Sequence, residues 1–560
     1  MEALGLVLAI AAFSSLIGLE AAPLLDWDEN MQSEVAKQVM ISGDVLQLQL
    51  NGQPFTEKPP LFFVEMAGFF KLFGVSEVSA RMTSAVNGLL FLCALFWIAS
   101  YLIDSQFATF WCLIYGSSLI PLVFSRSAIV EHTFNSLMAL GAMLLVAYDE
   151  AYSRFLDGPG AAHGDWRTRR AHWMWLLAAA LSLGLAVLAK GPSGGAVPLV
   201  AFAGYKIARR GTPLRLWHWA VCGGVSLAVA LSWYAANFAL HGGTFLQEFA
   251  RFMGLLFSKP LEGHSGPFYY HWAVALVGLF PWTPLLLLYA LPDIRKGIWA
   301  DPFGRALVSL GVVWALFILI VFSLVQTKLP HYSSGMYVPL TLLAALALFW
   351  AMDSNAKVPW WIYGIMAAYG ILAAVLFSVV PFHVAQIAAV NGAGLSNPPE
   401  VPAYAAGPGI VLGIGIAAGA LLLAMRKHLL GVMAVAVTMG AFVIGVWHVH
   451  LPLIAAYNQG PVIELMEEAY DQGGQLALYK NVSYAALFYG DQQIDMLGTY
   501  KFTGDPSRLD MPGDAPLFVI TAKEYEQELR HDHPRLIPVR SLGTLVMLKL
   551  PAKSERTGSG

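Results

Sequence analysis

Two adjacent carboxylates, Asp28 and Glu29, follow the first apolar run of the chain in the stretch LLDWDENMQSEVAKQVM. Asp and Glu side chains are too short to reach from a membrane boundary into water as Lys and Arg do, so simple interfacial anchoring does not explain them. A carboxylate here could act as a base, orient an incoming oxygen or bind an ammonium group. Alternatively, Asp28 could cap the helix that ENMQSEVAKQ predicts, and both interpretations stay open.

Other polar residues stand at similar places, in short connections between apolar runs. This set comprises Glu57, Lys58, Arg126, Glu131, Lys190, Arg251, His264, Lys328 and Tyr332. Four separate connections therefore offer cations near a membrane-embedded face, which suits an anionic, lipid-linked ligand. For any single Lys or Arg, anchoring at the interface remains the alternative.

A divalent metal, such as zinc, is a further hypothesis for this face. Its ligands would be Glu57 or Asp28 together with His264. A single His in a loop is usually not a ligand, so we expect that no cofactor is required.

The composition predicts that membrane helices position these residues. The chain has 560 residues, of which 57% are hydrophobic and 12% charged, against about 25% charged in soluble domains. Many apolar runs approach the roughly 20 residues that a spanning helix needs. We therefore expect an all-α polytopic membrane protein with about thirteen spans, near residues 2–22, 82–103, 106–124, 129–150, 172–190, 193–209, 216–240, 270–292, 305–326, 338–352, 359–380, 406–425 and 429–447.

The distribution of Lys and Arg predicts how the chain is oriented. Alternate loops are rich in basic residues, with Arg154, Lys206, Arg295, Lys357 and Arg426 as examples, and the positive-inside rule places these loops in the cytoplasm. The opposite connections then face outward, which in a bacterium is the periplasm. They are residues 23–81, 241–269, 327–337, 381–405 and everything after 448.

The chain divides into a membrane domain, residues 1–458, and a soluble outer α/β domain, residues 459–552, followed by a flexible tail, residues 553–560. Within 23–81, ENMQSEVAKQVM and PLFFVEMAGFFKLFG predict helices that lie at the interface, because each is too short to span. In the outer domain QLALYK, APLFVITA and TLVMLKL predict strands, while GPVIELMEEAYDQG and AKEYEQELRH predict helices. This domain carries no recognisable catalytic constellation, and no nucleotide loop or nucleic-acid stripe is present in the sequence.

Several motifs together resemble the polyprenyl-phosphate-dependent GT-C glycosyltransferases, and among them the 4-amino-4-deoxy-L-arabinose transferases of lipid A. The matching stretches are DENMQSEVAKQVMISGD, FTEKPP, AKGPSGGAVP, HSGPFYY, LFPW and KLPHY, which run from residue 26 to about 340. Two positions depart from the family: Met31 and Gln32 stand where Arg and Tyr are usual. In addition, VEH places Glu131 where the family has Asp.

The resemblance implies an enzyme of the bacterial inner membrane that moves aminoarabinose from undecaprenyl phosphate to a lipid A phosphate, with inversion. Such a modification implies resistance to polymyxin and cationic peptides. Asp28, Glu57 and Lys58 would be catalytic. The substrate-binding residues would be Glu29, Arg126, Glu131, Lys190, Arg251, Lys328 and Tyr332. The lysines and Arg251 suit phosphates, and Asp28 and Glu57 suit the sugar ammonium or an incoming oxygen. We expect a monomer that binds membrane lipids and no nucleic acid.

Two alternatives remain. An enzyme like the protein O-mannosyltransferases would keep the fold but need a base for a hydroxyl acceptor, and Asp28 could be that base. A transporter of polyprenyl-linked sugars would more typically show internal repeats and charges at the bilayer midplane, whereas here the polar residues gather at one face.

Overall fold

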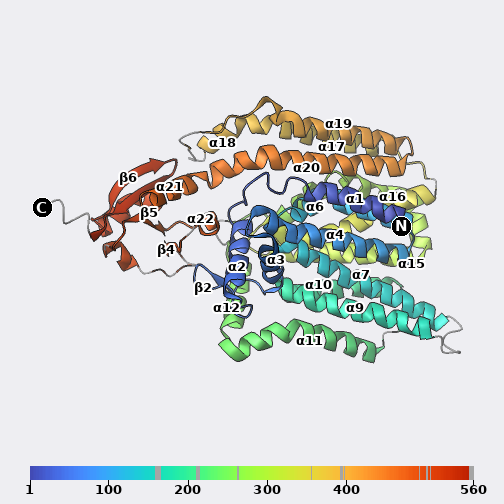
Figure 1. Cartoon of the computed structure of the whole chain (residues 1–560). Coiled ribbons are helices and arrows are strands. Elements are labelled where there is room, and N and C mark those ends of the chain that lie inside the picture. The colour runs from blue at the N-terminus through green and yellow to red at the C-terminus, as the bar shows by residue number, and fades with distance from the viewer. Residues whose placement is uncertain are drawn as a thin grey trace.

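The computed structural model describes residues 1–553 apart from 158–165, 210–212, 214, 261–263, 355, 391–394, 396–397, 491, 500–501, 503, 505 and 512. Residues 554–560, which make up most of the predicted flexible tail, lie outside the described residues. The rest forms a bundle of long helices with a small sheet beyond one end (Figure 1).

Long apolar helices form the bundle and run side by side (Figure 1). In chain order they are α1 (Glu2–Leu16), α4 (Glu77–Leu102), α5 (Ser105–Ser117), α6 (Leu119–Ser125), α7 (Val130–Asp157), α9 (Trp166–Lys190), α10 (Ser193–Arg209), α11 (Leu216–His241), α13 (Tyr270–Gly278), η2 (Thr283–Ala290), α15 (Pro302–Leu324), α16 (Tyr337–Asp353), α17 (Trp360–Val379), α19 (Gly407–Ala424) and α20 (His428–Asn458). Their core consists of buried Leu, Ala, Phe and Trp side chains, such as Trp111, Trp282 and Trp314. The chain is therefore an integral membrane protein with the predicted helical class.

The number of membrane crossings is smaller by strict criteria than the thirteen predicted. Among the described residues, nine helices are long and apolar enough to cross a membrane, and up to eleven if each of two bent pairs counts as one span. The bent pairs are α5 with α6, at 74°, and α13 with η2, at 100°. Helices α1, with 15 residues, and α10, with 17, are shorter. Each predicted run coincides with a helix or bent pair, but the count of thirteen stays a prediction.

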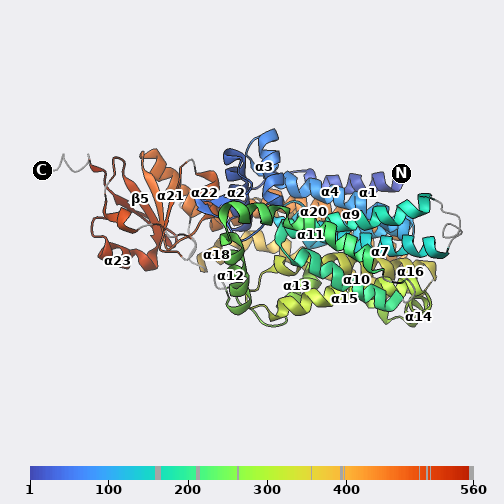
Figure 2. The same ribbon diagram turned by 90° about the horizontal axis from the view of Figure 1, so that it is seen from below.

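Shorter helices lie at the end of the bundle next to the sheet. They are α2 (Asp28–Ser42), α3 (Leu61–Phe73), α12 (Thr244–Ser258) and α18 (Val384–Val390), and a small hairpin of β1 (Gln49–Leu50) and β2 (Gln53–Pro54) joins α2 to α3. In Figure 1, α2 and α12 run across the long helices instead of along them. At the opposite end of the bundle lies α14 (Pro292–Ala300), which carries two of the basic residues predicted to be cytoplasmic (Figure 2).

The C-terminal sheet has five strands in the order β4-β3-β5-β7-β6. They are β3 (Gln475–Tyr479), β4 (Asp495–Leu497), β5 (Leu517–Ala522), β6 (Ile537–Leu542) and β7 (Leu545–Leu550). Strand β3 is parallel to β4 and β5, while β7 is antiparallel to β5 and β6. Alongside the sheet are α21 (Gly460–Asp471), α22 (Tyr484–Tyr489) and α23 (Lys523–Asp532). This confirms the predicted small α/β unit; β4, β6 and α22 are the elements that the sequence patterns did not reveal.

Helix α22 connects the sheet to the shorter helices at this end of the bundle, because it packs against α2. Lys37 of α2 donates a hydrogen bond to the carbonyl of Phe488 at 3.1 Å. Asn51, at the tip of the β1–β2 hairpin, donates to the carbonyl of Ile494 at 2.7 Å. The C-terminal unit is therefore in direct contact with the helix that begins at Asp28.

Candidate active site

A cavity of about 380 Å³ lies among α2, α12, the end of α15 and the 3₁₀ helix η3 (Pro330–Met336). Much of its lining is apolar: α12 contributes Phe252, Met253, Leu256 and Phe257, and α15 contributes Val321 and Phe322. The amphipathic sequence of α12 explains this wall, since its apolar residues recur at helical spacing. The charged and titratable residues of the lining include Asp28, Glu57, Lys58, Lys190, His264 and His331. A lined space of this kind fits a molecule with an apolar tail and a charged head.

Five charged or titratable side chains form a continuous chain beside the cavity. Lys58 Nζ lies 3.6 Å from Asp28 Oδ1, and His331 Nδ1 lies 3.8 Å from Asp28 Oδ2. On its other side His331 Nε2 lies 3.8 Å from Glu131 Oε1, which accepts a hydrogen bond from Lys190 Nζ at 2.8 Å. Carboxylates thus alternate with Lys and His side chains from Lys58 to Lys190. These residues come from α2, the connection before α3, η3, α7 and α9, so the fold brings together five separate segments.

Asp28 is the first residue of α2, and Trp27 stands at the N-cap position. Within the described residues α2 starts without a side-chain capping hydrogen bond, so the capping interpretation of Asp28 does not apply. Gln32, one turn on, donates to Asp28 Oδ1 at 3.4 Å and accepts from the Val130 backbone N–H at 2.8 Å. Gln32, at a position where the family usually has Tyr, therefore links Asp28 to the start of α7.

The neighbours of Asp28 favour its ionised form. Burial raises the pKa of the Asp28 carboxyl, but the positive charges of His331 and Lys58 lower it by more, so its pKa lies below the ordinary value. About a third of the side chain, 35%, stays exposed toward the cavity. Asp28 is thus an anion that a ligand can still reach.

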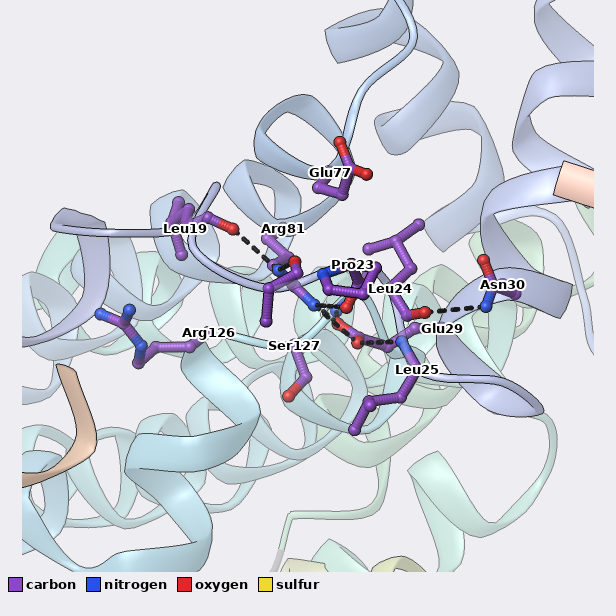
Figure 3. A network of polar contacts seen from close by, with 12 residues as sticks. Leu19, Pro23, Leu24, Leu25, Glu29, Asn30, Glu77, Arg81, Arg126 and Ser127 are labelled. Carbon is purple, nitrogen blue, oxygen red and sulfur yellow. Dashed lines mark hydrogen bonds and ion pairs between the residues drawn. The ribbon is translucent and has the colours of Figure 1, made fainter. Parts of the chain in front are cut away.

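Glu29 does not reach the cavity, although it follows Asp28 directly. Its carboxylate accepts two hydrogen bonds from the Arg81 guanidinium, both at 3.0 Å, and one from the Ala128 backbone N–H at 2.8 Å. Figure 3 shows Arg81 pointing into the turn between α1 and α2, where Glu29 meets it. Both side chains are almost completely buried. Glu29 is therefore placed to hold the fold together, not to bind substrate as its position beside Asp28 suggested.

Arg126 is likewise committed inside the protein. Its guanidinium donates to the carbonyl oxygens of Ser14, Ile17 and Gly18, at 2.7 to 3.2 Å, and lies 4.9 Å from the ring centre of Trp447. It satisfies a carbonyl in the last turn of α1, which a helix end leaves without a partner, and two carbonyls directly after the helix. The sequence predicted a substrate contact; the structure gives Arg126 a structural one.

Two other predicted phosphate ligands lie away from the described lining of the cavity. Lys328 is buried and donates to the carbonyls of Phe322 and Ser323, at 2.9 and 2.8 Å, where it closes the C-terminal end of α15. Arg251 points outward from α12, with 71% of its side chain exposed, and pairs with Glu248 at 3.3 Å. A positive charge near a membrane boundary thus has several uses besides phosphate binding.

Glu57, His264 and Tyr332 all line the cavity as the sequence indicated. Lys190 Nζ lies 5.6 Å from the ring centre of Tyr332, at the distance of a cation–π contact. Among the described residues no group of three or more His, Cys, Asp or Glu side chains gathers as metal ligands would. Glu57 and His264 therefore remain two candidate ligands in the lining of the same cavity.

The central residue of the charged chain, His331, was predicted from the sequence to lie on the outward face, but it was not assigned a catalytic or binding role. It belongs to the KLPHY stretch, whose Lys328 and Tyr332 were both selected. A signal was available, since a third titratable residue stood in the same short outer connection. Sequence alone gave no way to know that η3 turns His331 toward Asp28 and Glu131.

The fold is one that is known from a solved structure. The chain has the GT-C fold: it superposes on the crystal structure of ArnT from Cupriavidus metallidurans bound to undecaprenyl phosphate with a TM-score of 0.75, at 20% identity and over 98% of both chains. Residues 10–246 match the model of the dolichyl-phosphate-mannose-protein mannosyltransferase family.

Proteins with similar sequences have names that specify a sugar and its lipid donor. The chain is 25% identical over 384 residues to the undecaprenyl phosphate-alpha-4-amino-4-deoxy-L-arabinose arabinosyl transferase of Aeromonas salmonicida, covering 66% of this chain and 64% of that protein. With the enzyme of the same name from Edwardsiella ictaluri it shares 24% identity over 326 residues, 57% of this chain and 54% of that one. The matched region thus spans less than two thirds of these relatives. The predicted resemblance is confirmed.

Proposed function

We propose that the chain is an inverting, polyprenyl-phosphate-dependent glycosyltransferase that moves 4-amino-4-deoxy-L-arabinose from undecaprenyl phosphate to a phosphate of lipid A. The reaction would take place at the periplasmic side of the bacterial inner membrane, with the chain acting as a monomer. Relatives named for this donor and this sugar support the proposal. So does the likeness of the fold to an ArnT structure bound to undecaprenyl phosphate.

The observation that carries the proposal is the cavity, whose lining combines apolar and charged side chains. Its apolar wall on α12 and α15 suits an isoprenoid chain, which gains free energy as its surface leaves water. Its polar wall ends in Lys58 and Lys190, which can neutralise a phosphate. Because both substrates are lipids with charged heads, a site at the membrane boundary lets their tails stay in the bilayer.

In the proposed step, an oxygen of the lipid A phosphate attacks the anomeric carbon of the sugar from the side opposite the leaving group. The bond from that carbon to the oxygen of undecaprenyl phosphate breaks, and undecaprenyl phosphate leaves with the electron pair. The attacking phosphate is already an anion near neutral pH, so it needs little help from a base. Positioning and stabilisation of the departing negative charge are therefore the main tasks.

The charged chain can perform these tasks. Lys58 lies 3.6 Å from Asp28, too far for a good hydrogen bond, so it can turn to the leaving phosphate at small cost. Lys190 is held by Glu131 and supports the same charge from the other side. Asp28 and Glu57 would bind the sugar ammonium and fix the orientation of the anomeric carbon.

We further propose that these cations make a metal unnecessary. Excess EDTA is then expected to leave the turnover of the purified enzyme unchanged. A loss of turnover that Zn²⁺ restores in the wild type, but not in His264→Gln, would instead establish the metal site that Glu57 and His264 could form.

The function can be tested by mass spectrometry of lipid A. Cells that lack their own aminoarabinose transferase but make the donor should gain an aminoarabinose mass increment on lipid A when they express this chain. Cells that express Asp28→Asn at the same protein level should not. Unmodified lipid A with the wild-type chain would contradict the proposal.

The family match over residues 10–246 favours one second candidate, an enzyme that transfers a polyprenyl-linked sugar to a protein hydroxyl. In that reaction the acceptor must lose a proton, and Asp28 would take it. Glycosylated periplasmic proteins together with unmodified lipid A in the same cells would decide for this candidate.

A further inference from the structure

The C-terminal unit holds the short segment that leads from α1 into α2. Gln459 donates from its side chain to the carbonyl of Leu24 at 2.9 Å, and the Tyr489 hydroxyl accepts from the Leu24 backbone N–H at 2.9 Å. The same hydroxyl donates to Glu77 at 2.9 Å, at the start of α4. Residues more than 400 positions later in the chain thus fix the backbone just ahead of the cavity.

Asp26 makes two further hydrogen bonds with the C-terminal unit. One oxygen of its carboxylate accepts from the Ser483 hydroxyl at 2.9 Å, and the other accepts from the Ala485 backbone N–H at 2.9 Å. The second oxygen also accepts from the N–H of Trp27, at 2.9 Å. A single carboxylate therefore ties the start of α22 to the residue that precedes Asp28.

Trp27 has an unusual backbone at this point, with φ 75° and ψ −110°. Side chains other than glycine rarely adopt a positive φ, and such strain persists only where the surroundings enforce it. Two contacts hold it here: the Trp27 N–H donates to Asp26, which is itself bound to the start of α22, and the Trp27 ring makes a T-shaped contact with Tyr484 of α22, with ring centres 5.5 Å apart. Trp27 also lines the cavity.

The strained residue sets the direction of Asp28. The carbonyl of Trp27 accepts the hydrogen bond from the Met31 N–H, at 2.8 Å, in the first turn of α2. Any relaxation of φ at Trp27 would rotate this turn and move the Asp28 carboxylate relative to Lys58 and His331, which lie at 3.6 and 3.8 Å. At these distances Lys58 and His331 hold Asp28 only weakly. The position of Asp28 therefore depends more on the backbone contacts that Asp26 and Trp27 make with α22.

We propose that Asp26 and Ser483 are positioning residues for the transfer reaction, through which the C-terminal unit fixes Asp28 in the cavity by holding the strained backbone at Trp27. The inference rests on the proposed function, and it assigns a role to a domain whose sequence shows no catalytic group of its own. Neither residue touches the cavity in the described structure; both act through Trp27 and Asp28.

The test uses the full-length enzyme in detergent or proteoliposomes. Ser483→Ala and Asp26→Ala are expected to lower kcat at least tenfold, with little change in KM for the undecaprenyl-phosphate donor. Ser483→Thr keeps a hydroxyl at this position and should restore most of the loss. A matched control is Asn51→Gly, which removes another contact to the C-terminal unit while glycine accepts the φ of 53° found there; this variant should behave like the wild type.

The pH profile separates positioning from simple loss of folded enzyme. If Asp28 moves away from Lys58 and His331, its carboxyl becomes easier to protonate, and the acid limb of the activity profile in Ser483→Ala shifts to higher pH. A smaller amount of intact enzyme would lower the rate without moving that limb. Wild-type kcat in both variants, or an unshifted limb with the same loss in Asn51→Gly, would overturn the proposal.

Backbone hydrogen exchange gives a readout that does not need the reaction. Peptides from residues 24–33 should exchange faster in Ser483→Ala than in the wild type, while peptides from α4 should not change. If the wild-type chain fails to modify lipid A, the proposed function is wrong, and faster exchange in 24–33 still supports the attachment. Unchanged exchange there would refute it.

Discussion

Asp28 and Glu29 are neighbours in the sequence, yet they belong to two very different groups of charges. Glu29 sits with Arg81 in a closed group, where the guanidinium makes five hydrogen bonds of 2.6 to 3.0 Å to Glu29 and to the carbonyls of Leu19, Ala22 and Pro23. Asp28 sits in an open group, 3.6 Å from Lys58, 3.8 Å from His331 and beside a cavity. Because consecutive residues of a helix point in different directions, Glu29 serves the fold and Asp28 faces the cavity.

The difference shows that buried charges stabilise the fold in the closed group and stay available to a ligand in the open group. In the closed group every interaction is short, so the buried ions recover the cost of leaving water, and removing one partner leaves the other uncompensated. In the open group the contacts of Asp28 with Lys58 and His331 are too long to be good hydrogen bonds, and they can be exchanged for contacts with a ligand. A site that must bind and release charged head groups needs the second arrangement.

The largest expected effect comes from breaking the closed group. Glu29→Ala should lower the free energy of unfolding by about 3–5 kcal/mol, because it leaves the Arg81 charge buried without its partner. Thermal unfolding in detergent and the yield of folded protein measure this. Arg81→Met, made together with Glu29→Met, removes both charges and should recover part of the loss. Normal stability of Glu29→Ala would remove the distinction between the two groups.

Next in size is the loss of activity in Asp28→Asn. The change is nearly isosteric but abolishes the negative charge, so transfer to lipid A should fall by at least about a hundredfold, or ~2.7 kcal/mol, as for other groups that fix charge in a transition state. Its unfolding midpoint should stay within a few degrees of the wild type, in contrast to Glu29→Ala. Unimpaired transfer would show that Asp28 serves only the first turn of α2.

Lys58→Ala should weaken the open group from its other side. We expect a loss of about 2 kcal/mol of transition-state stabilisation, roughly thirtyfold in kcat/KM, from removing one charge-assisted contact. Lys58 also lowers the pKa of Asp28, so without it the Asp28 carboxyl protonates at higher pH. The acid limb of the pH–activity profile should therefore move upward. A lower yield of protein with an unchanged profile would make Lys58 structural.

The contrast between the two groups also shows how far the sequence could lead. Apolar length predicted the helices of the membrane part, and alternation and amphipathic spacing predicted β3, β5, β7, α21 and α23, because these patterns follow from local geometry. Helix α22 was not predicted: VSYAALFYG is short and apolar, and only its contacts in the fold show that it is a helix that packs against α2.

For the site, residue type and location on the outer side selected Asp28, Glu57, Lys58, Lys190 and Tyr332, which the fold does gather around one cavity or its charged chain. The same reasoning selected Glu29, Arg126 and Lys328, which face the interior. Their partners are Arg81 and backbone carbonyls far along the chain. The direction of a side chain depends on such distant partners, so no local pattern could have separated the two sets.

The smallest expected effect concerns Arg251, which belongs to neither group. Its side chain is 71% exposed and pairs only loosely with Glu248, and exposed pairs of this kind contribute little, about 0–1 kcal/mol. Arg251→Ala should therefore change KM for the undecaprenyl-phosphate donor by less than about twofold, whereas Leu256→Ser, on the cavity side of α12, should raise it clearly, because it places a hydroxyl in the apolar wall. Steady-state kinetics with the donor varied measures both. A tenfold rise in Arg251→Ala would mean that α12 turns when the donor binds, so that Arg251 joins the open group only in the complex.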